Sequence, residues 1–204
     1  MFEGIKTKIN AAKELRSWWR DLPTVTIRGI EAKWIRSDPI GNATLHGSGM
    51  ILAASGRLPG IGPFIMTDEF WEWLPVVTQN FILCHEVGHL LAGHCTRYAR
   101  QGVAKLLKGM PKEDVAMSNR RIGDEFVADE MAANIVGAAG AVVALKQMRS
   151  AIHRVQNDLL LKNGDLLSPV EYNQAIRDIQ GSSDELSRRI THIEDAMWAG
   201  EISA

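Results

Sequence analysis

Residues 81–94 read Phe81-Ile82-Leu83-Cys84-His85-Glu86-Val87-Gly88-His89-Leu90-Leu91-Ala92-Gly93-His94. Within them, His85-Glu86-x-x-His89 has the spacing that zinc hydrolases use. On an α-helix, residues four apart stand on the same face, so both imidazoles can point at one metal ion. Glu86 is rotated by about 100° and can reach a water molecule at that metal. The helix is half a site, because a catalytic zinc takes three protein ligands and keeps one position open. The alternative is a helix that merely carries two polar residues on one face.

A second helix supplies the candidate third ligand. Residues 124–133 form a helical pattern with apolar faces, in which Glu125 and Asp129 are four apart and share one face. We predict that Glu125 is the third metal ligand and that Asp129 accepts the outer N–H of a metal-bound histidine, which fixes its tautomer. The separation of 36 residues between His89 and Glu125 is enough to return this helix antiparallel to the first. A solvated acidic helix face is the alternative.

His94 is the other candidate ligand. It lies nine residues past His85, so on a continuous helix it faces about 180° away from that residue. A break at Gly93 would be needed to bring it back. The metzincin pattern does not fit, because Ala92 and Cys95 stand where that pattern needs Gly and His. We therefore expect His94 to have a structural role or to contact a ligand from outside.

Length and composition predict one domain spanning residues 1–204. The chain is 46% hydrophobic and 23% charged, which is ordinary for a soluble globular protein. Its net charge of −1 gives no field that would favour nucleic acid or an anionic membrane. Cys84 and Cys95 would lie about 16 Å apart on one helix, so we expect two reduced thiols and a cytoplasmic location. The N-terminus lacks the apolar core of a signal peptide, and the longest apolar run, residues 135–145, is too short to cross a bilayer.

The order of elements predicts an α+β fold, with a small, mostly antiparallel sheet followed by a helical majority. Residues 1–22 form an amphipathic helix that packs on the domain or, alternatively, lies on a membrane surface or a partner. Residues 23–67 form the sheet, with a glycine-rich loop at 56–62, and residues 75–100 form the active-site helix. Residues 118–204 are helical, and helix caps are expected at 168–171 and 182–185.

The two motifs together resemble the gluzincin metallopeptidases of the HtpX and CAAX prenyl-protease type. The likeness rests on His85-Glu86-Val87-Gly88-His89-x-x-x-x-His94 and on Glu125-x-x-Ala128-Asp129, and it covers roughly residues 40–190. It implies a zincin-like fold in a minimal soluble form, without the long membrane helices of many members. It also implies that Asn42 and Ala43 belong to an edge strand that holds extended substrate, and that Arg189 helps to polarise the scissile carbonyl.

One departure from the family concerns that carbonyl. Ser183 stands where the family has a second polarising residue, a histidine, and His192 or Tyr172 are the candidates to replace it.

The sequence therefore predicts a zinc-dependent endopeptidase with one Zn²⁺ per chain. His85, His89 and Glu125 would bind the zinc, Glu86 would act as general base toward a metal-activated water, and Asp129 would orient a histidine ligand. Arg189 would help to stabilise the oxyanion. The expected substrate is an extended peptide or an unfolded protein that adds as a strand to the sheet edge. Two alternatives remain: a zincin fold that binds a partner with weak or no hydrolysis, and a helical structural protein in which the motif is accidental.

Overall fold

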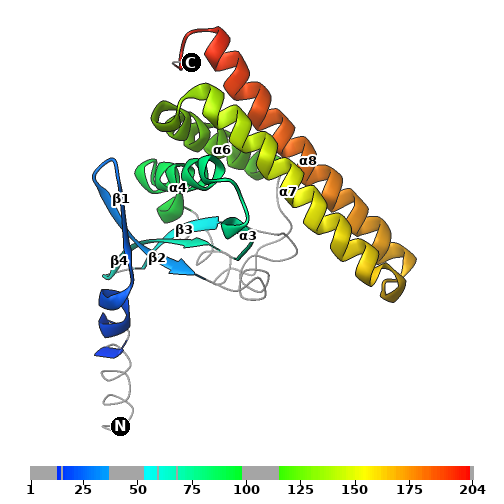
Figure 1. Cartoon of the computed structure of the whole chain (residues 1–204), viewed down its shortest axis with the longest axis horizontal. Helices are drawn as coiled ribbons and strands as arrows, with labels where there is room; N and C mark the ends of the chain where they lie inside the picture. The colour runs from blue at the N-terminus through cyan, green and yellow to red at the C-terminus, as the bar shows by residue number, and fades with distance from the viewer. Residues whose placement is uncertain are drawn as a thin grey trace.

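A computed structural model describes residues 13–14, 16–36, 53–58, 60–67, 69–97 and 115–202, and only the backbone of residues 115–120, 159 and 163. Short strands come first and long helices follow (Figure 1). In chain order the elements are β1 (Thr24–Ile27), β2 (Ile30–Arg36), β3 (Ala53–Leu58), β4 (Gly62–Thr67), α3 (Glu69–Glu72), α4 (Val76–Leu91), α6 (Val115–Val136), α7 (Ala138–Asn163), the 3-10 turn η1 (Gly164–Leu166) and α8 (Pro169–Trp198). The α+β class with a helical majority is confirmed, and the zincin-like arrangement stays a prediction.

The four strands form one mixed sheet in the order β1-β2-β4-β3. The outer pairs, β1–β2 and β3–β4, are antiparallel, as predicted for most of the sheet. The central pair, β2–β4, is parallel, so the expectation of antiparallel strands joined by short connections is wrong there. The physical reason is a crossover: residues 37–61 separate the two strands and include β3 at the sheet edge, so β4 returns beside β2 in the same direction.

The third strand covers Ala53–Leu58. The glycine-rich segment 56–62, predicted as a loop, instead holds the end of β3 and the start of β4. Gly56 is paired with Phe64 on β4, and a side chain at Gly56 would meet the Phe64 ring at 2.5 Å. Glycine is needed at this strand position because the ring of Phe64 packs directly on its backbone. The chain does not turn at Gly56.

Part of the predicted N-terminal helix lies in the described residues. Residues 16–21 are helical, and Trp19 is buried with its ring edge-on to Phe64 at a centroid distance of 6.3 Å. This end of the helix thus packs on the sheet. Residues 1–12, which carry most of the predicted amphipathic stripe, lie outside the described residues.

The helices surround one apolar core. Phe81 of α4, Leu145 of α7 and Ile193 of α8 are fully buried in it, together with alanines of α6 and α7. α8 begins with the predicted capping box, in which Ser168 and Glu171 bond each other's backbone N–H groups. The second predicted cap, at 182–185, is wrong. α8 continues through it as one helix of 30 residues, because packing against α7 and α6 outweighs the local preference of Ser and Asp for a helix start.

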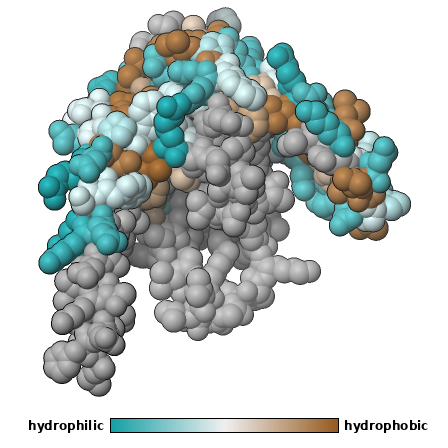
Figure 2. All heavy atoms as spheres, turned by 60° about the horizontal axis from the view of Figure 1, so that its bottom comes forward, coloured by the Kyte–Doolittle hydropathy of each residue, from teal (hydrophilic) through white to brown (hydrophobic). Residues whose placement is uncertain are grey.

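The α7–α8 hairpin extends away from the sheet (Figure 1). Its far end carries Leu161 and Leu166, which are 83% and 82% exposed. Figure 2 shows apolar residues, in brown, on the surface at the far end of this arm. Within the described ranges, no helix combines the length and the apolar content that crossing a bilayer requires.

Candidate metal centre

The contact between α4 and α6 positions the whole centre. A Cβ at Gly88 of α4 would lie 3.0 Å from the Cα of Ala128 on α6 and 3.1 Å from its carbonyl oxygen, so only glycine permits this separation. Ala128 is itself fully buried. Because the His85 to His89 turn contains Gly88, and Ala128 lies between Glu125 and Asp129, the close approach brings both pairs of predicted site residues face to face.

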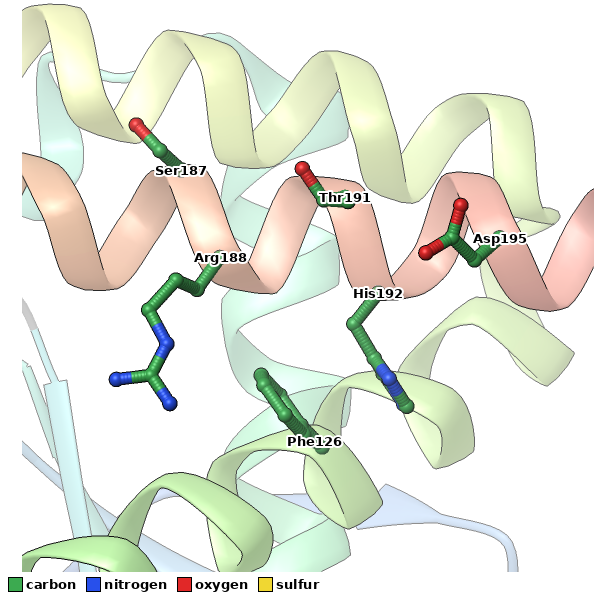
Figure 3. Close-up of a pocket in the computed structure, with 6 residues that line it drawn as sticks. All are labelled: Phe126, Ser187, Arg188, Thr191, His192 and Asp195. Atoms are coloured by element: carbon green, nitrogen blue, oxygen red, sulfur yellow. The ribbon is translucent and has the colours of Figure 1, made fainter.

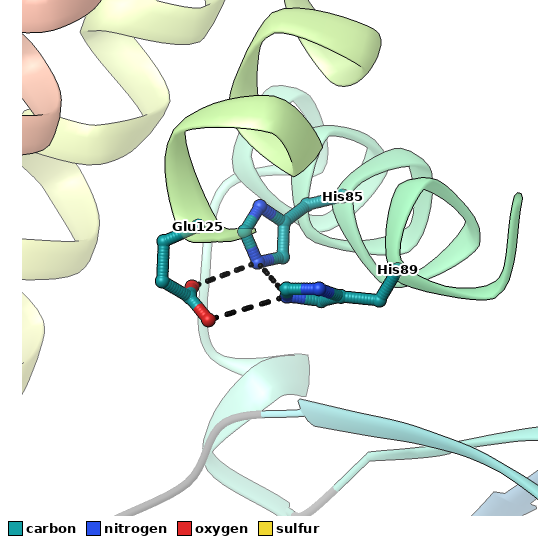
Figure 4. Close-up of side chains that lie close together, drawn as sticks. All are labelled: His85, His89 and Glu125. Carbon is teal, nitrogen blue, oxygen red and sulfur yellow. Dashed lines mark hydrogen bonds and ion pairs between the residues drawn. The ribbon is translucent and has the colours of Figure 1, made fainter. Parts of the chain in front are cut away.

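Three side chains converge there (Figure 4). The Nε2 atoms of His85 and His89 are 3.0 Å apart. One Glu125 carboxylate oxygen lies 3.2 Å from Nε2 of His85, and the other lies 3.3 Å from Nε2 of His89. Both histidines are buried and Glu125 is partly exposed. These three residues form a group that could hold a metal ion.

The spacing of the donor atoms fits a small divalent cation. A tetrahedral zinc with bonds of about 2.0–2.1 Å holds its ligand atoms about 3.3 Å from one another. The two Nε2 atoms are 3.0 Å apart, and each has a different Glu125 oxygen at 3.2 or 3.3 Å, so the separations are close to that value. Two imidazole nitrogens and a carboxylate are also the donor types found in catalytic zinc sites. The residues present therefore could hold a divalent metal ion.

Each histidine is also held at its outer nitrogen. The Nδ1 of His85 lies 2.8 Å from Oδ1 of Asp129, the partner that the sequence predicts. Asp129 is fully buried and accepts two hydrogen bonds of 2.7 Å from Arg189, one from Nε and one from a terminal nitrogen. The Nδ1 of His89 lies 2.8 Å from Nδ1 of His94, so His94 does contact a histidine of the group from outside.

His94 reaches this position because α4 stops early. The helix was predicted to run to about residue 100, but it ends at Leu91, and Gly93 adopts a left-handed conformation with φ of 73°. Residues 94–97 then form a separate helical turn. The predicted continuous helix is wrong because its pattern tolerates a glycine in the interior, whereas the chain uses that glycine to end the helix.

The electrostatics of the centre favour a bound cation. Burial lowers the pKa of His85, but the carboxylates of Asp129 and Glu125 outweigh it and raise the pKa to about 10. Burial raises the pKa of Glu125, yet His85, His89 and Arg189 hold it well below its usual range. The carboxylate is therefore charged at neutral pH, and the site attracts a proton or a metal ion.

At neutral pH Asp129 is ionised, whereas His94 is uncharged. Burial acts to raise the pKa of Asp129, but Arg189 and His85 lower it, so the carboxylate is ionised. Burial lowers the pKa of His94, which keeps that imidazole neutral and able to accept a hydrogen bond.

Glu86 follows His85 on α4 and is only 7% exposed. It has no hydrogen bond or ion pair with any other residue that the structure describes. A buried carboxylate that is not used in a structural ion pair is a candidate for a chemical role. This location agrees with the general base predicted for Glu86.

Arg189, which the family resemblance assigns to the scissile carbonyl, contacts two carboxylates of the centre. It is 6% exposed, and besides Asp129 it contacts Glu125 at 3.2 Å. Its role toward a carbonyl stays a prediction. These two partners depend on how α8 packs against α6, which the sequence alone does not reveal.

The remaining residues named for the polarising role, or for the substrate edge, are on α8 or outside the described residues. Ser183 accepts a hydrogen bond from Ser187 at its backbone oxygen. Tyr172 packs near Gly164 in the first turn of α8, about 25 Å along the helix from Arg189. Asn42 and Ala43, the predicted substrate edge, lie outside the described residues.

His192 lines a hollow between α6 and α8 that is separate from the metal-binding group. Its ring stacks on Phe126 with centroids 4.1 Å apart, and its Nε2 lies 2.6 Å from Glu130. Figure 3 shows Arg188 and His192 projecting from α8 toward Phe126. The hollow has a volume of about 450 Å³, and none of the three residues of the metal-binding group lines it.

Sequence reasoning missed Asp124 and Arg97. Asp124 lies 3.2 Å from Nε2 of His94 and accepts hydrogen bonds of 2.8 and 2.9 Å from Arg97. Asp124 directly precedes Glu125, so it belongs to the helix already singled out. The sequence does show Asp124 as a second carboxylate beside the predicted ligand Glu125. Its partner His94 could not be assigned from the sequence, because that contact depends on the break in the helix at Gly93.

Comparisons with known proteins gave no match for this chain, whether among protein-family models, curated protein sequences or solved structures. The fold and the centre therefore define an α+β protein with a His-His-Glu group that could hold a metal ion.

Proposed function

We propose that this protein is a zinc-dependent endopeptidase. The observation that carries the proposal is the convergence of His85, His89 and Glu125 at separations suited to zinc. Glu86 follows His85 on α4, is buried, and has no hydrogen bond or ion pair with another described residue, which supports hydrolysis as the chemistry. Two imidazoles and a carboxylate directed at one point between two helices are an arrangement that either a ring proton or a metal ion can hold together, and only the metal ion would give the centre hydrolytic chemistry.

Each residue of the centre has a distinct role in the proposed mechanism. The two histidines and Glu125 would hold the ion, which when bound supplies Lewis-acid activation of a water molecule and of the scissile carbonyl. Glu86 accepts the proton of the attacking water and returns it to the leaving amine. Asp129 holds His85 with its Nε2 lone pair directed inward, and Arg189 keeps Asp129 ionised and fixed.

Charge balance supports a divalent ion in this place. The pKa values of Glu125 and Asp129 are both lowered, so both carboxylates are ionised, and Arg189 contributes one positive charge beside them. A divalent ion would add positive charge next to these carboxylates, and buried charge is tolerated only when it is compensated.

The proposed substrate is an unfolded or extended polypeptide. β3 is an edge strand of the sheet and packs beside α4, which carries the two histidines. Ser55 of β3 lies 3.5 Å from Cys95, just beyond the end of α4. A peptide added to this edge would run past the metal centre as an extra strand, which selects for extended segments.

The test compares the wild-type chain with Glu86→Gln. The variant should keep stoichiometric zinc, while the chelator-sensitive cleavage of an unfolded protein such as reduced casein should fall by about 10²–10⁴-fold. Glu194→Gln is the matched control, because Glu194 forms a surface ion pair with Lys146 and should have no effect. Equal cleavage by wild type and Glu86→Gln would refute the assigned base.

A zinc-dependent binding protein is the second candidate. The position of Arg189 favours it, because the predicted oxyanion donor is bound to Asp129 and Glu125 instead. Stoichiometric, zinc-dependent binding of the unfolded protein without any cleavage would support this candidate and refute the peptidase.

A further inference from the structure

His94 connects a carboxylate to His89 through a second imidazole ring. His89 and His94 face each other with their Nδ1 atoms 2.8 Å apart, and both side chains are buried. Two imidazole nitrogens can form a hydrogen bond only if one carries a proton and the other does not. If Nε2 of His89 offers its lone pair to a metal, the proton of His89 must be on Nδ1. His94 must then accept at Nδ1 and carry its own proton on Nε2.

The surroundings of His94 match this requirement. Its Nε2 lies 3.2 Å from Oδ1 of Asp124, a carboxylate that can only accept. Asp124 is 8% exposed and is held by Arg97 through contacts of 2.8 and 2.9 Å. Arg97 donates hydrogen bonds to Asp124, Asp124 contacts Nε2 of His94 as an ion pair at 3.2 Å, and His94 shares a hydrogen bond with His89. In this arrangement the Nε2 lone pair of His89 is left for the metal-binding group.

The arrangement parallels the support of the other histidine. At His85, an arginine holds a carboxylate, and the carboxylate contacts the ligand ring directly. At His89, Arg97 holds Asp124, and the imidazole of His94 lies between that carboxylate and the ligand ring. The two histidines of the group therefore receive equivalent support by different routes.

We propose that His94 is a positioning residue, which fixes the tautomer and the orientation of His89 for metal binding by relaying the Asp124 carboxylate through its ring. The proposal rests on the metal-binding part of the proposed function and not on peptide hydrolysis. Outer partners of this kind typically affect metal affinity by about 10–100-fold.

The experiment measures zinc affinity of the full chain by competition with a chromophoric chelator. His94→Leu removes the acceptor, so zinc should bind about 10–100-fold more weakly. His94→Asn keeps a carbonyl acceptor and should recover most of the loss. His192→Leu is the matched control, because it also removes an imidazole bonded to a carboxylate of α6, and it should leave the affinity unchanged. Equal losses in the Leu and Asn variants, or no loss in either, would overturn the proposal.

A second measurement needs no variant and so does not depend on whether His94→Leu folds. Two-bond ¹H–¹⁵N spectra of the zinc-loaded wild type should show His89 protonated on Nδ1 and His94 protonated on Nε2. The opposite tautomer of His94 would overturn the relay.

The outcomes also separate this proposal from the proposed function. Failure of the wild type to bind zinc would overturn both, whereas zinc binding that is indifferent to His94→Leu would overturn the relay alone. Zinc binding that responds as expected, without peptide cleavage, would support the relay and overturn only the peptidase.

Discussion

Gly88→Ala should separate the two helices that build the metal centre. The new Cβ would lie 3.0 Å from the Cα of Ala128, whereas carbon atoms pack at about 3.5–4.0 Å. α6 must therefore move away by about half an ångström at this point. Metal–ligand distances tolerate deviations of about 0.2 Å, so Glu125, three residues from Ala128, would be moved beyond that limit. We expect zinc to bind about 10–100-fold more weakly.

The stability of Gly88→Ala should change less than its metal affinity. Overpacking of this kind costs about 1–3 kcal/mol, while replacing glycine by alanine inside a helix gains about 0.5–1 kcal/mol. The free energy of unfolding in the presence of chelator should therefore fall by about 0–2.5 kcal/mol. Zinc affinity by chelator competition is the sharper assay, and urea unfolding of the metal-free protein gives the packing term.

Gly181→Ala is the matched control for Gly88→Ala. Gly181 lies inside α8, and a Cβ there would meet no atom within 4 Å. The control should gain about 0.5–1 kcal/mol of stability and leave zinc affinity unchanged. Wild-type zinc affinity in a folded Gly88→Ala protein would show that the distance between α4 and α6 does not set the geometry of the centre, and would refute the reasoning.

Three further predictions concern single residues around the centre. Arg189→Leu leaves the buried Asp129 carboxylate without its cation and should lower the free energy of unfolding, measured in urea, by about 3–5 kcal/mol. The exposed control Arg188→Leu should lose less than about 0.5 kcal/mol. Equal losses in the two variants would contradict the ion-pair account. In Gly93→Ala the new Cβ meets no atom within 4 Å, so the variant should lose only the cost of a left-handed alanine, about 1–2 kcal/mol of unfolding free energy measured by thermal unfolding. Unchanged stability would contradict this. Burial lowers the pKa of metal-free His85, but nearby carboxylates raise it to about 10, so below that pH zinc must displace one proton. Zinc affinity should then rise about tenfold per pH unit between about pH 6 and pH 8, and an affinity independent of pH would contradict this assignment.

The ligand positions could be predicted from the sequence because their signals are local. His85 and His89 share a helix face by spacing alone, and so do Glu125 and Asp129. The sequence also indicates that one helix must return against the other. It does not reveal how closely they approach, which depends on Gly88 meeting a small residue on the facing helix.

What the sequence could not reveal depends on contacts between distant segments. By local sequence alone, Gly93 and Gly56 would each be read as a possible break in regular structure. In the structure Gly93 follows the end of a helix, whereas Gly56 lies in a strand beneath the ring of Phe64. The contacts of Arg189 with Asp129 and Glu125 could not be predicted, because α8 is oriented by its packing against α6 and α7. The parallel pairing of β2 and β4 likewise follows from a crossover that no single segment encodes.

α6 determines the geometry of the centre more than any other element. It supplies Glu125 to the metal-binding group, Asp129 to His85, and Asp124, through His94, to His89. Any shift of α6 against α4 therefore changes one ligand and the outer partners of the other two at once. The converse also follows: a metal ion that joins the two helices should stabilise their contact, by about 2.7 kcal/mol at a free zinc concentration one hundred times its dissociation constant. Zinc affinity and the stability of the Gly88 contact with α6 thus both depend on the interface between α4 and α6. A variant that weakens one should weaken the other.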